Sequence, residues 1–317
     1  MLRHFKGSSA KNSRAGIALD GPNVGIARVH RQAGGPPSLA IRLFDADGDW
    51  LEEAAEHADD LELQRTPTSS VLSANSYQLQ LLEIPNVPRE ELLDALRWRL
   101  KDLIDFPVEE AVVELLEMPP HSNPGAPHTG YAVVTRRAEV MQQVESMERA
   151  DLNMDVIDIP ELCVRNVAIM LPENKDGVAF LHFTEDRGYL TITRQDVLHL
   201  TRHLDKGRRA IAAAAADDFM LQELIGSIAL EVQRSLDYYE SHYDCRPVTQ
   251  IALGPGDGLD ALTAGLAQNL GITVQTIDFQ DLFSLEEDVS PAVQGSSLLA
   301  VGAALRSDAA PQGGHAS

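Results

Sequence analysis

A turn that can bind phosphate stands near the start of the sequence. The segment GIALDGPNVGIARV, residues 16–29, has two short apolar runs joined by Asp20-Gly21-Pro22-Asn23. Small residues in such a hairpin leave backbone N–H groups free to cradle a phosphate group. This hairpin holds no Lys, and its one carboxylate lies beside the turn rather than inside the first strand. The pattern therefore indicates a nucleotide-binding hairpin that lacks part of the usual chemistry.

The other residues that could do chemistry form no complete site. His199 and His203 are four residues apart, which is the spacing of a metal-ligating pair on a helix. The alternation in VLHLTRHL favours a strand instead, where residues four apart lie about 13 Å from each other. Ser69, Ser70 and Ser73 belong to no nucleophile-elbow pattern. We therefore predict structural histidines, no catalytic residue and no metal site.

Composition and charge exclude several classes of function. At 317 residues, 44% of them hydrophobic, the chain is expected to form two domains. Its formal net charge of -22 repels phosphate backbones, which excludes nucleic acid as a partner. No apolar run reaches membrane-spanning length, so we expect a soluble, cytoplasmic protein. The first 14 residues contain four basic and no acidic side chains, and we predict a solvated basic tail there.

Periodicity predicts the elements that position these residues. Strand-like segments and one acidic helix occupy residues 15–80. From Pro88 onward the leucines follow a helical period, and Phe106-Pro107 ends that helix. Two strands and a second helix follow up to residue 150. This block of helix, strand, strand and helix predicts a subdomain inserted between other strands.

The second half of the chain begins as the first half does, with strand, turn and strand. The segments VAFLHF and GYLTITR flank the turn Glu185-Asp186-Arg187-Gly188. A long helical region follows to Tyr243, then the strand TQIALG, the turn GPGDG, a helix, and a last helix rich in small residues. The repetition predicts a duplicated α/β unit with a cleft between the copies.

Five segments in a fixed order carry a resemblance to a known family. They are the opening hairpin, RWRLKDLIDFPVEEAVVE, ITRQDVLHLTR, LEVQRSLDYYES, and IALGPGDGL followed by AVGAALR. Across most of the chain these segments resemble the PilM/MshI family of type IV and MSHA pilus assembly proteins. The resemblance implies an α/β protein with the actin-like (ribonuclease H-like) ATPase fold.

That resemblance, taken with the periodicity, divides the chain into two duplicated α/β domains and an inserted α+β subdomain. The predicted parts are a basic tail (1–14), actin-like domain 1 (15–80 and 151–175), a partner-binding inserted subdomain (81–150), actin-like domain 2 (176–306) and a disordered tail (307–317).

The resemblance also implies where a nucleotide site would lie and what it lacks. Actin-like proteins use an Asp in the first strand to hold Mg²⁺ and a Lys or similar donor for the phosphates. Aligned without a gap, these positions are Ala18 and Gly25, and the Asp position of the second hairpin is His182. A methyl group and a neutral imidazole are poor ligands for Mg²⁺. We therefore predict a degenerate nucleotide site, no required cofactor and no enzyme activity. The residues of this site are Asp20, Gly21, Asn23, Gly254, Gly256 and Gly258.

A second alignment of the first hairpin stays open. Shifting the match by two residues makes Asp20 the metal-side acid, but it shortens the turn and unpairs Val24 and Ile26. With this alignment the protein would be an ATP-binding switch or weak ATPase of the same machinery, with ATP and Mg²⁺ as its cofactors.

The resemblance implies a protein partner as well. In PilM-type proteins a groove beside the inserted subdomain receives the cytoplasmic N-terminal segment of a bitopic inner-membrane protein of the PilN/MshJ type. The candidate partner-binding residues are Trp98, Leu103, Phe106 and Pro107, and the alternative is that the apolar ones belong to the core.

The function implied is a cytoplasmic scaffold of a type IV (MSHA-type) pilus assembly platform. Its partner would hold it at the inner membrane, and the assembly motor ATPase is a further expected partner. The cytoplasmic part of a GspL-like secretion protein is disfavoured, because no membrane span follows the actin-like portion.

Overall fold

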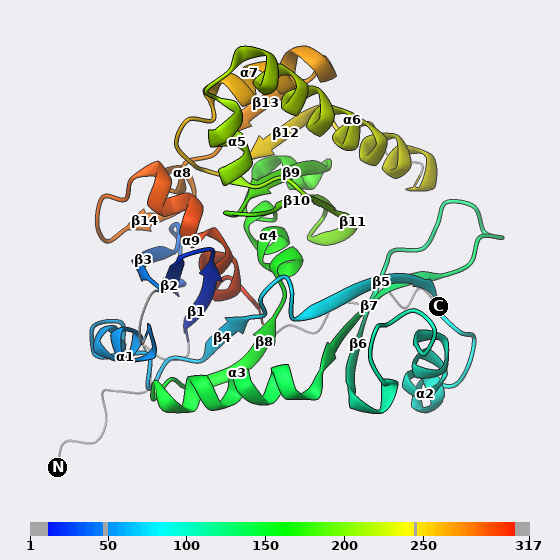
Figure 1. The fold of residues 1–317 in the computed structure, drawn as a ribbon, viewed down its shortest axis with the longest axis horizontal. Coiled ribbons are helices and arrows are strands. Elements are labelled where there is room, and N and C mark those ends of the chain that lie inside the picture. Colours follow the sequence, from blue (N-terminus) through cyan, green and yellow to red (C-terminus); the bar gives the residue numbers. More distant parts are fainter. Residues whose placement is uncertain (1–11, 47–49, 244–245, 308–317) are drawn as a thin grey trace.

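Two α/β lobes lie side by side, and a smaller unit projects from them (Figure 1). The computed structural model describes residues 12–46, 50–243 and 246–307. Each lobe is built on its own β-sheet, and the smaller unit has a sheet of three strands. We call these parts the first lobe, the second lobe and the inserted subdomain.

The first lobe is built on a six-stranded sheet with the order β14-β3-β2-β1-β4-β8. Its strands are β1 (Ser13–Asp20), β2 (Asn23–His30), β3 (Ser38–Asp45), β4 (Thr68–Val71), β8 (Met154–Asp158) and β14 (Ser284–Leu285). β1, β2 and β3 form an antiparallel meander, and β4 and β8 extend the sheet in parallel from β1. The hairpin predicted over residues 16–29 is confirmed.

The second lobe repeats this arrangement on a five-stranded sheet with the order β11-β10-β9-β12-β13. Its strands are β9 (Val178–Phe183), β10 (Gly188–Arg194), β11 (Val197–Leu204), β12 (Gln250–Leu253) and β13 (Thr273–Thr276). The first three are again an antiparallel meander and the last two are parallel to β9. The same order and directions occur in β3-β2-β1-β4-β8, so the predicted duplication of an α/β unit is confirmed.

The inserted subdomain has an antiparallel sheet with the order β5-β7-β6. Its elements are β5 (Tyr77–Glu83), α2 (Arg89–Leu100), the 3-10 helix η2 (Val108–Glu110), β6 (Ala111–Glu117) and β7 (Thr129–Arg136). Leu100 of α2 packs with Val113 and Val134 of the sheet in a small apolar core. β5 begins at Tyr77, ahead of the start predicted for the subdomain at residue 81.

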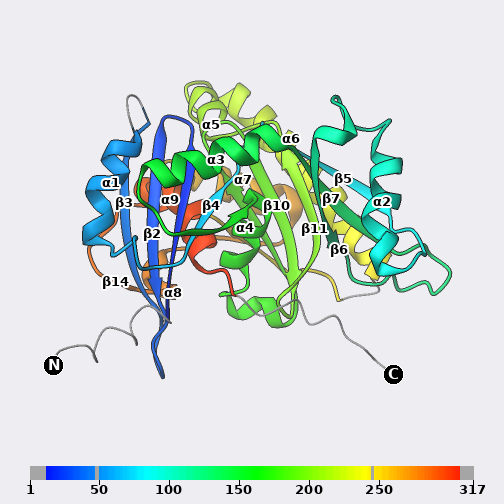
Figure 2. The same cartoon turned by 90° about the horizontal axis from the view of Figure 1, so that it is seen from below.

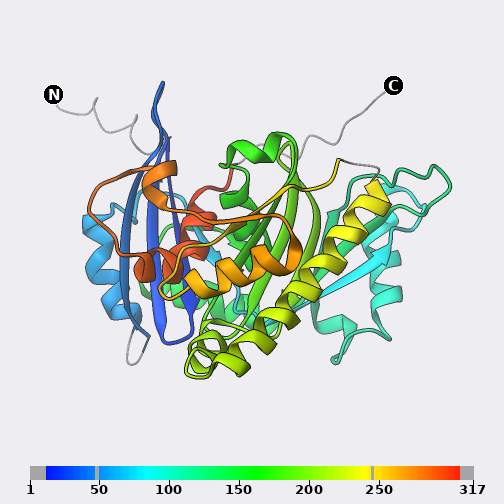
Figure 3. The same cartoon turned by 90° about the horizontal axis from the view of Figure 1, so that it is seen from above.

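The remaining helices form the layers that cover the two larger sheets. They are α1 (Trp50–Asp60), α3 (Arg137–Arg149), α4 (Pro160–Ala168), η3 (Pro172–Lys175), α5 (Arg208–Ala214), α6 (Asp218–Tyr243), α7 (Asp260–Leu270), α8 (Phe279–Leu282) and α9 (Pro291–Ala304). α1 and α3 lie on the outer face of the first sheet (Figure 2). α6 and α7 lie on the outer face of the second sheet (Figure 3). No helix in the described ranges is long and apolar enough to cross a membrane.

α4 and α9 fill the space between the two sheets (Figure 1). They approach their neighbours closely because small residues stand at the contacts. A β-carbon at Gly16 of β1 would lie 2.1 Å from the carbonyl oxygen of Ala300, and one at Gly302 would lie 2.1 Å from that of Cys163. The small-residue helix α9 is therefore held between the first sheet and α4 by direct backbone contact.

The first strand begins inside the predicted basic tail. Arg14 is buried in β1 and donates to both carboxylate oxygens of Asp155, at 2.9 and 3.0 Å, so it does not belong to a solvated tail. Residues 1–11 and 308–317, which make up most of the predicted tails, lie outside the described residues.

Candidate functional site

The first predicted nucleotide-binding turn joins β1 to β2. Asp20 pairs with Asn23, so Gly21 and Pro22 alone form the turn, and Gly21 has a φ of 61°. A two-residue hairpin turn requires positive φ at this position, which glycine adopts without strain.

The strand register of this hairpin bears on the choice between the two alignments. Val24 pairs with Leu19 and Ile26 pairs with Ile17. This is the pairing that the gapless match assumes and that the alternative match would break.

The turn between β9 and β10, residues 184–187, lies directly against the first turn. A β-carbon at Gly21 would lie 2.5 Å from Cγ of Glu185. The second turn is closed by the backbone N–H of Thr184, which donates to the carbonyl of Arg187 at 2.8 Å. The two hairpins thus meet tip to tip, one from each lobe.

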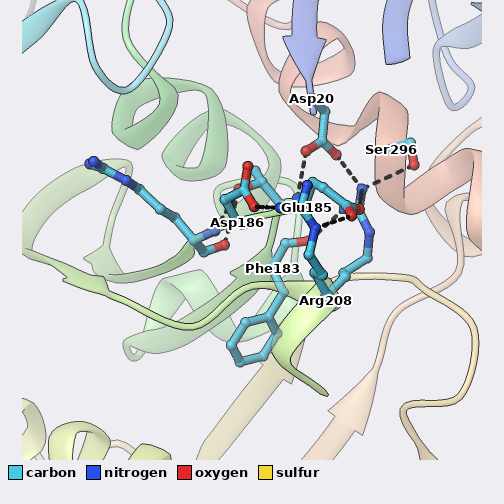
Figure 4. Close-up of polar contacts among 9 residues, drawn as sticks. Asp20, Phe183, Glu185, Asp186, Arg208 and Ser296 are labelled. Carbon is cyan, nitrogen blue, oxygen red and sulfur yellow. Dashed lines mark hydrogen bonds and ion pairs between the residues drawn. The ribbon is translucent and has the colours of Figure 1, made fainter. Parts of the chain in front are cut away.

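The Asp20 carboxylate bridges the two turns (Figure 4). Its Oδ1 accepts a hydrogen bond from the backbone N–H of Glu185 at 2.7 Å, and its Oδ2 accepts one from the Arg208 guanidinium at 2.6 Å. The side chain is 1% exposed. Burial raises the pKa of Asp20 above its ordinary value, while the charge of Arg208 and these hydrogen bonds oppose the rise.

Arg208 is the first residue of α5 and lies in the second lobe. Besides Asp20, its guanidinium donates to the carbonyl of Phe183 at 2.7 Å and to Oγ of Ser296 at 3.2 Å. The carboxylate of Glu185 is 3.7 Å away. Figure 4 shows the guanidinium surrounded by these groups, which come from β1, β9 and its following turn, and α9.

The third predicted turn, residues 254–258, follows β12 and is also packed against protein atoms. A β-carbon at Gly254 would lie 2.6 Å from Nδ1 of His182, and one at Gly295 of α9 would lie 2.5 Å from the carbonyl oxygen of Pro255. Gly256 packs beside the Leu259 side chain.

His182 is buried beside this turn and stays uncharged. Burial, assisted by the charge of Arg208, lowers its pKa to about 3. Within the described chain neither ring nitrogen has a hydrogen-bond partner. The imidazole is therefore neutral under ordinary conditions.

These residues do not fit a magnesium–nucleotide complex. Mg²⁺ needs free carboxylate oxygens and several waters around it. Both oxygens of Asp20 are engaged by donors of the chain, Ala18 offers only a methyl group, and His182 is neutral and enclosed. Across residues 12–46, 50–243 and 246–307, no group of three or more His, Cys, Asp or Glu side chains could hold a metal ion.

The structure therefore unites only part of the predicted nucleotide site. Asp20 and Gly21 meet the second turn, and Asn23 begins β2 beside them. Gly254 lies against His182, Gly256 lies beside Leu259, and a β-carbon at Gly258 would meet no atom within 4 Å. Arg208 and Ser296 were not predicted, because no local pattern marks either of them.

Trp98 and Leu103, predicted to line a partner groove, lie at the surface of the inserted subdomain. Trp98 is 80% exposed and Leu103 is 51% exposed. Leu96 and Leu100 point into the core from the same helix, and Trp98, two positions from each, lies on the opposite face. The alternative that Trp98 is a core residue is wrong.

Phe106 and Pro107 lie at the end of the segment that follows α2. Phe106 is half-buried against the core of the subdomain, and the guanidinium carbon of Arg136 lies 4.2 Å from its ring centroid. Pro107 is exposed and precedes η2. Phe106 thus belongs partly to the core, whereas Pro107, Trp98 and Leu103 are open to a partner.

A buried carboxylate joins the inserted subdomain to the second lobe. Glu161 of α4 is fully buried and accepts hydrogen bonds from the Tyr77 hydroxyl of β5, at 2.9 and 2.7 Å to its two oxygens. His203 of β11 lies against the same carboxylate, with its Nε2 2.5 Å from Oε1. His199 and His203 both lie on the strand β11, as predicted.

Two further contacts join the same parts. The Tyr131 hydroxyl of β7 donates to the carbonyl of Thr201 at 3.2 Å. The backbone N–H and the hydroxyl of Ser122 donate to the carbonyl of His242 at the end of α6, at 3.0 and 2.9 Å. Figure 3 shows α6 running from α5 toward this loop of the inserted subdomain.

Comparisons with known proteins give a structural likeness but no sequence match. No family model and no curated protein matches the sequence. The structure of a PilM–PilN type IV pilus biogenesis complex matches with 20% identity over 92% of this chain and 97% of that chain, at a TM-score of 0.68. The ethanolamine utilization protein EutJ from Carboxydothermus hydrogenoformans matches with 12% identity over 92% and 89%, at 0.48. The cytoplasmic domain of EpsL, from the type II secretion system of Vibrio cholerae, matches with 12% identity over 92% and 94%, at 0.46.

The fold follows from two independent observations. The order β3-β2-β1-β4-β8 recurs as β11-β10-β9-β12-β13, with the same strand directions. The alignment with the chain of the PilM–PilN complex extends over nearly the whole of both chains. The chain has the actin-like ATPase fold.

Proposed function

We propose that this chain is a cytoplasmic scaffold of a type IV (MSHA-type) pilus assembly platform. It binds the cytoplasmic N-terminal segment of a bitopic inner-membrane protein of the PilN/MshJ type, and that partner holds it at the membrane. The likeness to the PilM–PilN complex over 92% of this chain is the observation that carries the proposal. The assembly motor ATPase of the same machinery is a second partner that this function implies.

In this function the nucleotide site is degenerate and the protein is not an enzyme. The side chains between the hairpins support this. Arg208 forms an ion pair with the Asp20 carboxylate, and its guanidinium lies in the space beside that carboxylate. ATP and Mg²⁺ are accordingly not cofactors of the scaffold.

The inserted subdomain is the partner-binding surface in this proposal. Five of the eleven exposed large apolar side chains of the described residues lie in the inserted subdomain, between residues 77 and 136, and they are Leu81, Val87, Leu93, Trp98 and Leu103. Among the described strands, the outer strands β5 and β6 each pair only with β7. An extended peptide is held by pockets for apolar side chains and by hydrogen bonds to such a strand edge.

A binding measurement tests the proposal. The probe is a synthetic peptide of the cytoplasmic N-terminal segment of the bitopic membrane protein encoded beside this chain. Titration calorimetry without nucleotide is expected to give a micromolar Kd, or about -8 kcal/mol. Trp98→Ala and Leu103→Asp are expected to weaken binding more than tenfold, since exposed aromatic and apolar anchors carry most of the energy of such contacts.

The matched control is Phe219→Ala, which removes an exposed aromatic side chain (67%) from α6 of the second lobe. It should leave the Kd unchanged. Binding that is absent without Mg-ATP, or that is lost in Phe219→Ala but kept in Trp98→Ala and Leu103→Asp, would contradict the proposal.

A further inference from the structure

The positive charge between the two hairpin turns is supplied by the chain itself. A guanidinium nitrogen of Arg208 lies 2.6 Å from the Asp20 carboxylate and 3.7 Å from that of Glu185. Asp20 belongs to the first lobe, whereas Arg208 and Glu185 belong to the second. The side chains of Arg208 and Asp20 are 18% and 1% exposed, so solvent and salt screen their attraction only weakly.

The same guanidinium also reaches α9, which packs on the first sheet. It donates to Oγ of Ser296, while its other terminal nitrogen donates to the carbonyl of Phe183 in the second lobe. The backbone N–H of Glu185 adds a direct hydrogen bond from the second lobe to Asp20. One side chain therefore contacts both lobes through groups of three separate segments (Figure 4).

We infer that Arg208 is a built-in cation that keeps the cleft between the lobes closed. A free ligand closes a two-lobed protein only to the extent that it prefers the closed state and is bound. A cation attached to the chain is always present at high effective concentration. The closed arrangement therefore needs neither nucleotide nor metal. This inference rests on the degenerate site of the proposed function but makes no use of the protein partner.

The neighbouring arginine provides a matched control. Arg209 is 66% exposed, and its ion pairs with Glu185 and Asp186 both lie within the second lobe. Such surface pairs contribute little to stability. Arg209→Gln thus removes the same charge from the adjacent position without removing a contact between the lobes.

The test measures closure directly. Spin labels are placed by Asp59→Cys on α1 and Gln222→Cys on α6, both exposed, in a Cys245→Ser background that leaves only the buried Cys163. Pulsed electron paramagnetic resonance then reports the distance between the lobes. The parent and Arg209→Gln are expected to give one narrow distribution that Mg-ATP does not change. Arg208→Gln is expected to add a longer, broader component and to speed exchange of the Glu185 amide at least tenfold.

Removing Arg208 alone leaves Asp20 as a buried, unpaired charge, which can unfold the chain. The double variant Asp20→Asn, Arg208→Gln has no such unpaired charge, and it is used for the same measurements if the single variant does not fold. Distances and exchange equal to those of the parent in the folded Arg208 variants would overturn the inference, as would a parent whose distance shortens on adding Mg-ATP. Peptide titrations on the same samples separate the two proposals. A parent protein that does not bind the peptide contradicts the proposed scaffold function. The measured distances between the lobes alone test the inference that Arg208 keeps the cleft closed.

Discussion

Asp20 and His182 are two titratable side chains beside the cleft, and burial disfavours the charged form of each. They differ in whether anything offsets that burial. Asp20 accepts hydrogen bonds from Glu185 and Arg208, which favour its charged form. His182 has no hydrogen-bond partner among the described residues, and the charge of Arg208 also opposes its protonation. Of these two side chains, His182 is therefore the one through which low pH lowers the stability of the fold.

The first prediction is that His182→Leu reduces the loss of stability in acid. The pKa of His182 is about 3 in the folded protein, against 6.5 for an ordinary histidine. Between these values the unfolded chain binds more protons, so the free energy of unfolding falls as the pH is lowered. From pH 7 to pH 5 this amounts to about 2 kcal/mol. Urea unfolding at pH 7 and pH 5 should show a drop smaller by about that amount in the variant. Equal drops in parent and variant would contradict the burial argument.

At the residue scale, the turns of the candidate site could be predicted from the sequence, whereas Arg208 could not. Asp20 and the glycine turns were recognisable because their turn residues form local patterns. The contact of Arg208 with Asp20 joins residues 188 positions apart, and nothing near Arg208 in the sequence distinguishes it from Arg209. His182 was recognisable only as a departure from the expected Asp.

Among the elements, those with a clear hydrophobic period were predictable and those with buried polar residues were not. The hairpins, α6 and the start of α2 follow from their apolar spacing, but α2 ends at Leu100 rather than at the predicted Phe106. β4 was missed, since Thr68, Ser69 and Ser70 are buried in it without contributing to hydropathy. Trp98 was ambiguous because the sequence was interpreted as placing it on the apolar face of its helix. Its position two residues from the buried Leu96 and Leu100 turns it toward solvent instead.

The second prediction concerns α2. Leu100→Ala should lower the free energy of unfolding by about 2–5 kcal/mol, because it opens a cavity in the subdomain core. Trp98→Ala should change it by about 0.5 kcal/mol or less, because the indole is 80% exposed. Urea titrations followed by circular dichroism measure both. A large loss in Trp98→Ala would show that the indole packs against the chain after all.

The third prediction concerns the junction between the inserted subdomain and the second lobe. Tyr77→Phe removes a hydrogen bond to the buried carboxylate of Glu161 and should cost about 1.5–3 kcal/mol of stability. Tyr131→Phe removes a bond to a neutral carbonyl at the same junction and should cost about 1 kcal/mol. Chemical denaturation at pH 7 compares the two. A Tyr131 variant as unstable as the Tyr77 variant would mean that the carboxylate has no special part in the junction.

At the scale of the whole molecule, the two lobes of the actin-like ATPase fold meet at their hairpins through side chains of the chain itself. Both lobes retain the duplicated sheet order, and the hairpins still face each other. The space between them holds Asp20, Arg208 and Glu185. The duplicated fold is therefore compatible with a space between the hairpins that charged groups of the chain itself occupy.

The fourth prediction follows from these contacts between the hairpins. The purified protein should release no phosphate from Mg-ATP above the rate of a buffer blank, because Asp20 is engaged and no second carboxylate stands at the position of His182. A coupled phosphate assay over hours measures this, with Asp20→Ala as the comparison. Magnesium-dependent release that disappears in Asp20→Ala would contradict the prediction and would support the alternative alignment.

The position of α9 has a consequence for the order in which the protein acquires its structure during synthesis. α9 covers the inner face of the β1–β2 hairpin, yet Pro291 leaves the ribosome long after His30. The intervening segment of roughly 260 residues takes about 10–50 s to translate at ordinary rates. Throughout that time an apolar strand face built for α9 has no native cover. A circular permutant that begins at residue 288 would deliver α9 ahead of β1, so that the inner face of the β1–β2 hairpin would be covered as it emerges.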